Sequence, residues 1–79
     1  MNKDLREKSF KENGYYVTTF TTAKQVGTVC ICSGLDFAKA TRNYYRKYYS
    51  SVKILTREEL HEVQEREKEE RMRNYAHSY

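Results

Sequence analysis

The stretch YYVTTFTTAKQVGTVCICS, residues 15–33, decides the fold of this chain. Its first eight residues are aromatic and β-branched, and residues 28–33 form a second, short apolar run, so both segments favour β-strands. Residues 23–27 have the length of a hairpin loop and end in Gly27, which we expect at a position with an unusual φ. The sequence therefore predicts a β-hairpin, with one helical turn over residues 22–26 as the alternative.

Two helices and a third strand are predicted after the hairpin. Ser33 and Asp36 have the spacing of an N-cap and its reciprocal partner, so we expect a helix from there to about Ser50. Residues 52–55, VKIL, favour a short strand. The capping pattern recurs in the segment Thr56-Arg57-Glu58-Glu59, which opens a last helix that reaches into the 70s.

The N-terminal segment also predicts a helix. Residues 2–12 are rich in helix formers, and Asn13-Gly14 tolerates positive φ and so ends a helix. Leu5 and Phe10 are its candidate apolar anchors. We therefore expect this helix to be ordered when it docks on the rest of the chain.

The predicted order of elements indicates a small α+β fold. A three-stranded sheet, made of the hairpin and the third strand, is packed by a central basic helix. A 79-residue chain is expected to form one domain, which excludes an enzyme with separate cofactor and substrate lobes. The second and third strands would form a right-handed parallel crossover if they were neighbours. The expected parts are a short N-terminal helix in residues 1–14, an α/β core in residues 15–55 and a long charged C-terminal helix in residues 56–79.

The net charge of +4 is distributed unevenly along the chain. It is +1 for residues 1–14, +1 for residues 15–35, +4 for residues 36–53 and −2 for residues 54–79. No uncharged stretch is long enough to cross a membrane, and the charged N-terminal residues are unlike a signal peptide. We therefore expect an intracellular protein with one basic segment.

Residues 35–53 carry that positive charge beside many tyrosines. At 100° per residue, four cations fall together on one arc of a helix, and Lys47 lies further round. An adjacent arc of about 140° holds aromatic and apolar residues, and no acidic residue occurs between Asp36 and Glu58. The four cations are Lys39, Arg42, Arg46 and Lys53, and the adjacent arc contains Phe37, Ala38, Thr41, Tyr44, Tyr45, Tyr48, Tyr49 and Val52.

This segment predicts a surface that binds an anionic partner. The cations would steer the encounter, and the tyrosines at the border of the two arcs would anchor it. Two other interpretations stay open: the tyrosines cover the sheet while the cations face solvent, or the cations pair with the seven glutamates of the last helix. The predicted partner-binding residues are Lys39, Arg42, Tyr45, Arg46, Lys47, Tyr49 and Lys53.

The cysteines and histidines do not form a metal motif. Cys30 and Cys32 have a poor spacing for zinc, and His61 and His77 are far apart on the last helix. Neighbours along a strand are poorly placed for a disulfide, so the cysteines are expected to be core residues. No flanking signature supports a cysteine nucleophile. We therefore predict no metal, no cofactor and no enzymatic activity.

The last predicted helix combines charge pairs with an apolar end. Glu62–Arg66, Glu67–Arg71 and Glu69–Arg73 have the favourable i, i+4 orientation, which is typical of a solvated helix. A late apolar cluster at helical spacing could instead serve a homodimer or partner docking. Its residues are Met72, Tyr75, Ala76 and Tyr79.

The composition is similar to that of small accessory proteins of phages and mobile elements from low-GC bacteria. Some of these are inhibitors that dock on host machinery, anti-CRISPR proteins among them. The resemblance implies a non-enzymatic inhibitor, monomeric or homodimeric, in the cytoplasm of a host bacterium. It would dock its basic helix on an acidic protein or nucleoprotein surface and compete with nucleic acid where the target binds one. The alternative is a small DNA- or RNA-binding regulator that uses the same helix, although the sequence lacks zinc-finger, GxxG, RNP-like and helix-turn-helix patterns.

Overall fold

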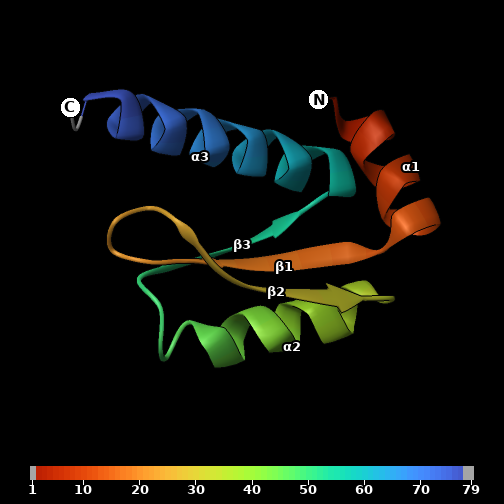
Figure 1. The fold of residues 1–79 in the computed structure, drawn as a ribbon. Helices are drawn as coiled ribbons and strands as arrows, with labels where there is room; N and C mark the ends of the chain where they lie inside the picture. The colour runs from red at the N-terminus through yellow and green to blue at the C-terminus, as the bar shows by residue number, and fades with distance from the viewer. Residues whose placement is uncertain (1, 78–79) are drawn as a thin grey trace.

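The computed structural model describes residues 2–77 and places the side chains of residues 2–73. In this part of the chain, three helices and a three-stranded antiparallel sheet confirm the predicted α+β fold (Figure 1). The short N-terminal helix and the long charged C-terminal helix are both present. The elements are α1 (Lys3–Asn13), β1 (Tyr15–Phe20), β2 (Val26–Cys32), α2 (Leu35–Tyr45), β3 (Ser51–Leu55) and α3 (Arg57–His77).

β1 lies in the middle of the sheet, in the strand order β2-β1-β3. Both neighbouring strands run antiparallel to β1, so β2 and β3 point the same way with β1 between them. α2 connects these two outer strands, which gives a split β-α-β arrangement. β2 and β3 are thus not neighbours, so the condition for a crossover between adjacent parallel strands is not met and the connection passes over β1.

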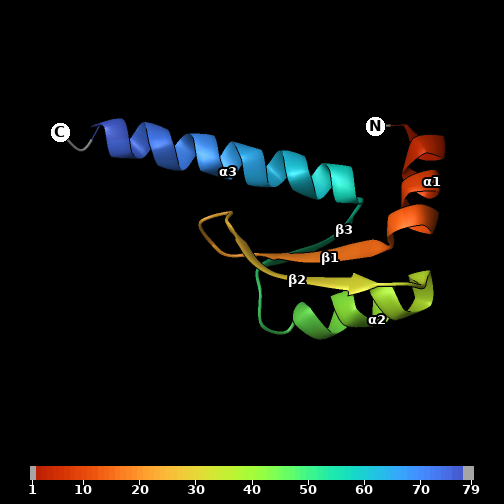
Figure 2. The same ribbon diagram turned by 45° about the vertical axis from the view of Figure 1, so that its right-hand side comes forward.

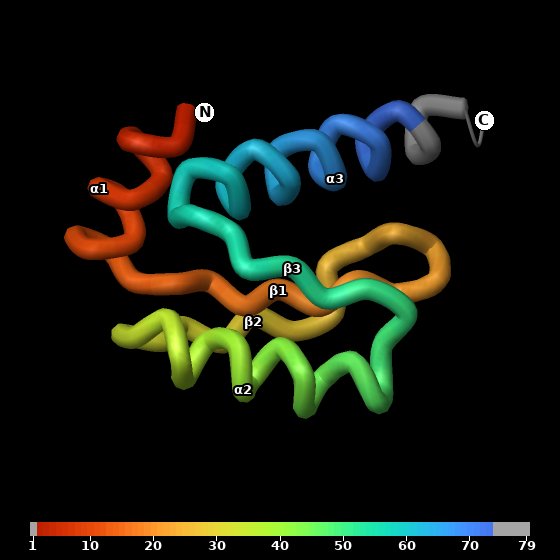
Figure 3. The backbone as a smooth tube through the Cα atoms, turned by 180° about the vertical axis from the view of Figure 1, so that it is seen from behind, coloured from red at the N-terminus to blue at the C-terminus, as the bar shows by residue number. Residues whose placement is uncertain are grey.

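α2 covers one face of the sheet, and α3 lies on the other face with α1 beside its first turns (Figures 1 and 2). On the α2 side, Val17 of β1 lies between Cys30 of β2 and Ile54 of β3 in the register. The same layers are visible from behind (Figure 3). The main core therefore lies between α2 and the sheet, and its buried members are Val17, Cys32, Ala38 and Val52.

The hairpin forms as predicted but contains a β-bulge. The register shifts between Thr18 and Phe20, where β2 carries an extra residue. The hydroxyl of Thr19 fills the gap in the ladder: it accepts from the N–H of Thr28 at 2.7 Å and donates to the C=O of Thr28 at 3.3 Å. A side chain thus replaces the backbone partner that the bulge removes.

One expectation about the hairpin loop was wrong, that of an unusual φ at Gly27. The residue with positive φ is Lys24, at 63°, and not Gly27, because the chain turns earlier, where Thr21 accepts from the N–H of Lys24. The alternative helical turn over residues 22–26 does not form, since residue 26 already belongs to β2. Gly27 is required for a different reason: a Cβ there would lie 2.9 Å from Cε1 of Tyr49.

α2 is shorter than predicted at its C-terminal end. It ends at Tyr45, because the N–H groups of Tyr48 and Tyr49 both donate to the C=O of Tyr45, and the chain then turns towards β3. The expected Ser33 cap was also wrong: Gly34 is the N-cap, and no side chain caps the helix. In place of a side-chain cap, the first turn of α2 has the negative charge of Asp36, which interacts favourably with the helix dipole.

The capping pattern that opens α3 is confirmed. The hydroxyl of Thr56 accepts from the N–H of Glu59 at 3.0 Å, and the Glu59 carboxylate accepts from the N–H of Thr56 at 2.9 Å. Thr56 is fully buried. This reciprocal pair fixes the point where the chain leaves the sheet and enters α3.

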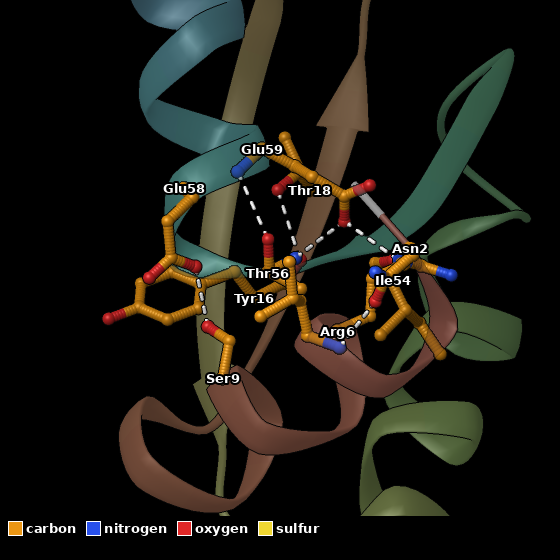
Figure 4. A network of polar contacts seen from close by, with 10 residues as sticks. Asn2, Arg6, Ser9, Tyr16, Thr18, Ile54, Thr56, Glu58 and Glu59 are labelled. Carbon is orange, nitrogen blue, oxygen red and sulfur yellow. Dashed lines mark hydrogen bonds and ion pairs between the residues drawn. The ribbon is translucent and has the colours of Figure 1, made fainter.

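α1 is held mainly by polar contacts with the start of α3 (Figure 4). Ser9 donates to the Glu58 carboxylate at 2.5 Å, and Nε of Arg6 lies 3.2 Å from the Glu59 carboxylate. Of the two expected apolar anchors, Phe10 stacks on Tyr15 with ring centroids 4.4 Å apart, whereas Leu5 is 52% exposed. The expectation for Leu5 was therefore wrong.

Gly27→Ala is expected to lower the free energy of unfolding by about 1–3 kcal/mol, because the new methyl group overlaps the Tyr49 ring. Urea unfolding measures the change. Gly34→Ala is the control: no atom lies within 4 Å of its Cβ position, so a loss below about 1 kcal/mol is expected from the weaker N-cap. Equal losses in the two variants would contradict the close approach.

The contact between α1 and α3 is expected to weaken in acid. The hydrogen bond from Ser9 lowers the pKa of the Glu58 carboxyl from its ordinary 4.5. A carboxyl whose pKa is lower in the folded state than in the unfolded state stabilises the fold at pH values above its unfolded-state pKa. This stabilisation is lost as the pH falls through the folded-state pKa. Amide hydrogen exchange in α1 is therefore expected to be faster at pH 3 than at pH 6, after correction for intrinsic rates. Glu58→Gln should reduce this pH dependence, and Glu62→Gln should leave it unchanged.

Candidate binding surface

The inner side of α2 packs on the sheet and fixes the orientation of the helix. Ala38 is fully buried, and Tyr45 and Tyr49 pack against the core. The hydroxyl oxygen of Tyr49 lies 3.0 Å from Oγ1 of Thr28 on β2. The structure thus shows a packing role for both tyrosines, while their role as partner anchors stays a prediction.

One side of α2 presents cations, and we call it the cationic flank. Leu35, Lys39, Arg42 and Arg46 follow each other at positions i, i+4, i+7 and i+11 and so lie on the same side of the helix. Lys39 and Arg46 are exposed, Arg42 is half-buried and Leu35 is 43% exposed. The flank therefore combines three positive charges with one accessible apolar side chain.

These cations have no carboxylate partner in the part of the chain whose side chains are placed. Among residues 2–73, the ion pairs within 4.0 Å are Arg6–Glu59 and His61–Glu65. Nε of Arg42 is also buried without a hydrogen-bond partner among these residues. Lys47, in the turn after α2, is exposed as well. The charge of α2 is thus not neutralised within the described chain.

Lys53 does not belong to the cationic flank, and its assignment to that arc was wrong. It lies on β3, opposite Thr18 in the register and therefore on the face of the sheet away from α2. Its Nζ is 5.8 Å from the centroid of the Phe20 ring. Because α2 ends at Tyr45, the 100° periodicity does not extend to residue 53.

The opposite side of α2 exposes an aromatic ridge that we did not predict, formed by Phe37, Tyr44 and Tyr48. These side chains are 65%, 56% and 67% exposed, and the two tyrosine rings are 5.5 Å apart. Thr41 shares this side of the helix and its hydroxyl lies 3.7 Å from Sγ of Cys32, so the ridge faces β2. In the sequence these residues belong to the predicted apolar arc of about 140°, whose width does not by itself distinguish its buried part from its exposed part.

The acidic helix lies on the other side of the sheet from the basic one. α3 and α2 are separated by the β-layer (Figure 2), and no ion pair joins them within residues 2–73. The interpretation in which the cations of α2 pair with the glutamates of α3 in the same chain is therefore wrong. The molecule has one basic and one acidic face.

α3 is held over the hairpin by one of its glutamates. The Glu67 carboxylate accepts from the N–H of Val26 at 2.6 Å, in place of the predicted pair with Arg71. Met72 is 65% exposed, and the side chains of Tyr75, Ala76 and Tyr79 lie outside the described residues. A dimer or docking role for this end of α3 stays a prediction.

An open groove of about 810 Å³ lies between α3 and the sheet. Phe20, Leu55 and Val63 give it apolar lining. Its carboxylates Glu59 and Glu67 already accept backbone N–H groups. Two further carboxylates and three cations, Glu62, Glu70, Lys24, Lys53 and Arg66, also line the groove, which therefore combines apolar and charged walls.

The cysteines are free thiols in the sheet, as expected for core residues. Cys32 is 1% exposed and Cys30 is half-buried. Burial, together with the neighbouring Cys32, raises the pKa of the Cys30 thiol, which disfavours a thiolate nucleophile. Within the residues described, no three His, Cys, Asp or Glu side chains gather where they could hold a metal ion. Nor does the described part of the chain contain a helix long and apolar enough to cross a bilayer.

Comparisons with protein-family models, with curated proteins and with solved structures find no match for this chain.

Two adjacent tyrosines of α2 are expected to differ strongly in their effect on stability. Tyr45→Ala should lower the free energy of unfolding by about 2–3 kcal/mol, because the ring packs on the core. Tyr44→Ala should change it by less than about 0.5 kcal/mol, because the ring is mostly exposed. Thermal or urea unfolding compares the two. A larger loss for Tyr44→Ala would show that α2 is rotated relative to the sheet.

Proposed function

We propose that this chain is a non-enzymatic binding protein that docks the cationic flank of α2 on an acidic protein surface. The observation that carries the proposal is the set of α2 cations without a carboxylate partner within residues 2–73. A solvated helix of mixed sequence normally places acidic residues among its basic ones, as α3 does. α2 has only Asp36, in its first turn.

The layering of the fold supports the same proposal. α2 and α3 lie on opposite sides of the sheet, about two layer spacings of roughly 10 Å apart. This distance exceeds the Debye length of about 8 Å at physiological ionic strength. The positive potential of α2 is thus available to a partner, and a partner with negative potential would be drawn to the α2 side.

An acidic protein fits this surface better than a nucleic acid. A duplex would have to accommodate the glutamates of α3 wherever it extended beyond α2. The flank is also short, with three cations along one helix, and exposed charges each add little affinity but raise the association rate. Leu35 supplies an apolar contact beside them. By occupying an acidic surface, the protein would act as an inhibitor of whatever else binds there, which is the role that the resemblance in composition to accessory proteins of phages implies.

The double variant Arg42→Glu, Arg46→Glu is expected to abolish partner binding without changing the circular dichroism spectrum. The matched control is Arg71→Glu, Arg73→Glu, which makes the same change of charge on exposed arginines of α3. Capture from nuclease-treated bacterial lysate should recover the same acidic protein with the wild type and with the control, and not with the α2 variant. Recovery that is equal in all three would refute the role of the cationic flank.

The nucleic-acid alternative is decided by a salt titration with single-stranded and duplex oligonucleotides. We expect no binding at low salt by fluorescence anisotropy. Binding whose log K falls steeply with log[salt], and that Arg42→Glu, Arg46→Glu removes, would assign the same flank to phosphates instead of to a protein.

A further inference from the structure

β2 is an outer strand of the sheet that carries no charge. It is hydrogen-bonded on one side to β1, and its other side is an edge (Figure 1). Residues 25–35 contain no Lys, Arg, Asp or Glu, and the chain contains no proline. Lysine, other inward or edge charges and proline are the devices by which proteins protect an exposed edge from pairing with another strand.

The opposite edge of the same sheet is protected. β3 is five residues long and carries Lys53 near its middle. Nη2 of Arg6, from α1, also donates to the C=O of Ile54 at 3.4 Å. β2 has one comparable contact, at its first residue, where the Glu67 carboxylate accepts from the N–H of Val26. Among the side chains placed in residues 2–73, none makes such a contact with the backbone of Val29 or Ile31, so this later part of β2 is the less protected edge.

The regular part of β2 directs a matched set of backbone groups outward. Both backbone groups of Thr28 face the hydroxyl of Thr19 on β1. Since consecutive residues of an antiparallel strand point their N–H and C=O groups to alternate sides, Val29 and Ile31 direct theirs to the free edge. The bulge is confined to Gly27 and Thr28 at the beginning of β2, so the spacing is regular from Val29 to Cys32.

Apolar side chains flank this edge on both faces of the sheet. On the α2 side, the aromatic ridge faces β2, as the contact of Thr41 with Cys32 shows. On the other side, Ile31 is 62% exposed. At 150–250 Å² per aromatic ring, the ridge alone exposes about 300–450 Å², close to half of the roughly 800 Å² that each partner contributes to a standard interface.

We infer that β2 pairs antiparallel with β2 of a second copy of this chain. A two-fold axis perpendicular to the sheet at Cys30 places Val29 opposite Ile31 of the second copy, so that their outward N–H and C=O groups pair. The two sheets then form one six-stranded sheet. A two-fold rotation about this axis does not exchange the two faces of the sheet. Both α2 helices therefore lie on the same face, and their aromatic ridges meet across the axis.

Charge favours a second copy as the occupant of this edge. Each copy brings a neutral strand and a neutral ridge, while the cationic flank of α2 lies on the side towards β3 and so points away from the axis. Two chains of net charge +4 can therefore approach without bringing their basic residues together. The inference is independent of the proposed function, since it uses the other side of α2.

Sedimentation equilibrium of the full chain, from about 1 to 200 μM, tests this dimer. We expect a monomer–dimer equilibrium that is weakened at least about tenfold by Tyr44→Lys and by Ile31→Lys, because each variant buries an unpaired charge at the axis. Asn43→Lys is the matched control, since Asn43 is the exposed neighbour of Tyr44 on α2, and it should leave the dissociation constant unchanged. Circular dichroism establishes that each variant is folded.

The outcomes that overturn the inference are specific. A wild-type chain that stays monomeric over the whole concentration range excludes the dimer. A dimer that Met72→Lys disperses, and that Ile31→Lys does not, assigns self-association to α3 and equally refutes the β2 edge.

Discussion

The molecule depends on the burial of the central strand β1 on both of its faces. Val17, Thr18 and Thr19 have no exposed surface. Alternation along the strand turns Val17 and Thr19 towards α2, and Thr18 towards the side of α3. A buried hydroxyl without a partner costs about 1–3 kcal/mol, and here each threonine hydroxyl donates to a backbone carbonyl, that of Tyr16 or that of Thr28. Two of the three buried side chains are thus small threonines with satisfied hydroxyls, so β1 can be covered by helices on both faces without large apolar side chains.

The two charged faces follow from this double coverage. A sheet that is covered by helices on both faces keeps those helices apart, so a basic helix and an acidic helix can coexist in a 79-residue chain without neutralising each other. The sheet also determines how α2 is used. One side of the helix is committed to the core, and the two remaining sides differ in chemistry, with cations towards β3 and aromatic rings towards β2.

The elements that could be predicted from the sequence are those whose signals are local. The hairpin, the third strand and the capping pair of Thr56 and Glu59 depend on neighbouring residues, and all three are present. The end of α2 was missed because residues 46–50 contain no glycine or proline that would mark the turn closed on the C=O of Tyr45. Lys53 was misplaced for a different reason: the 100° periodicity was continued to residue 53, although the helix was expected to end near Ser50 and residues 52–55 to form a strand.

The candidate surface was predicted in its charge but not in its shape. Lys39, Arg42 and Arg46 share one side of α2 as the periodicity indicated. Which aromatic residues face the core could not be read from the wheel alone, because the width of the sheet decides how much of the arc is covered. Tyr44 and Tyr45 are adjacent in sequence, yet one is mostly exposed and the other packs on the core.

The contacts that hold α1 also determine how local the folding of the chain can be. Ser9 and Arg6 bind Glu58 and Glu59, which follow them by 49 and 53 residues. β1 likewise has no partner on one side until residues 51–55 are made. These contacts join residues that are far apart in the sequence, and such long-range closure slows folding. The hairpin of β1 and β2 can form from neighbouring residues, whereas α1 and the second edge of β1 are completed only when residues 51–59 join them.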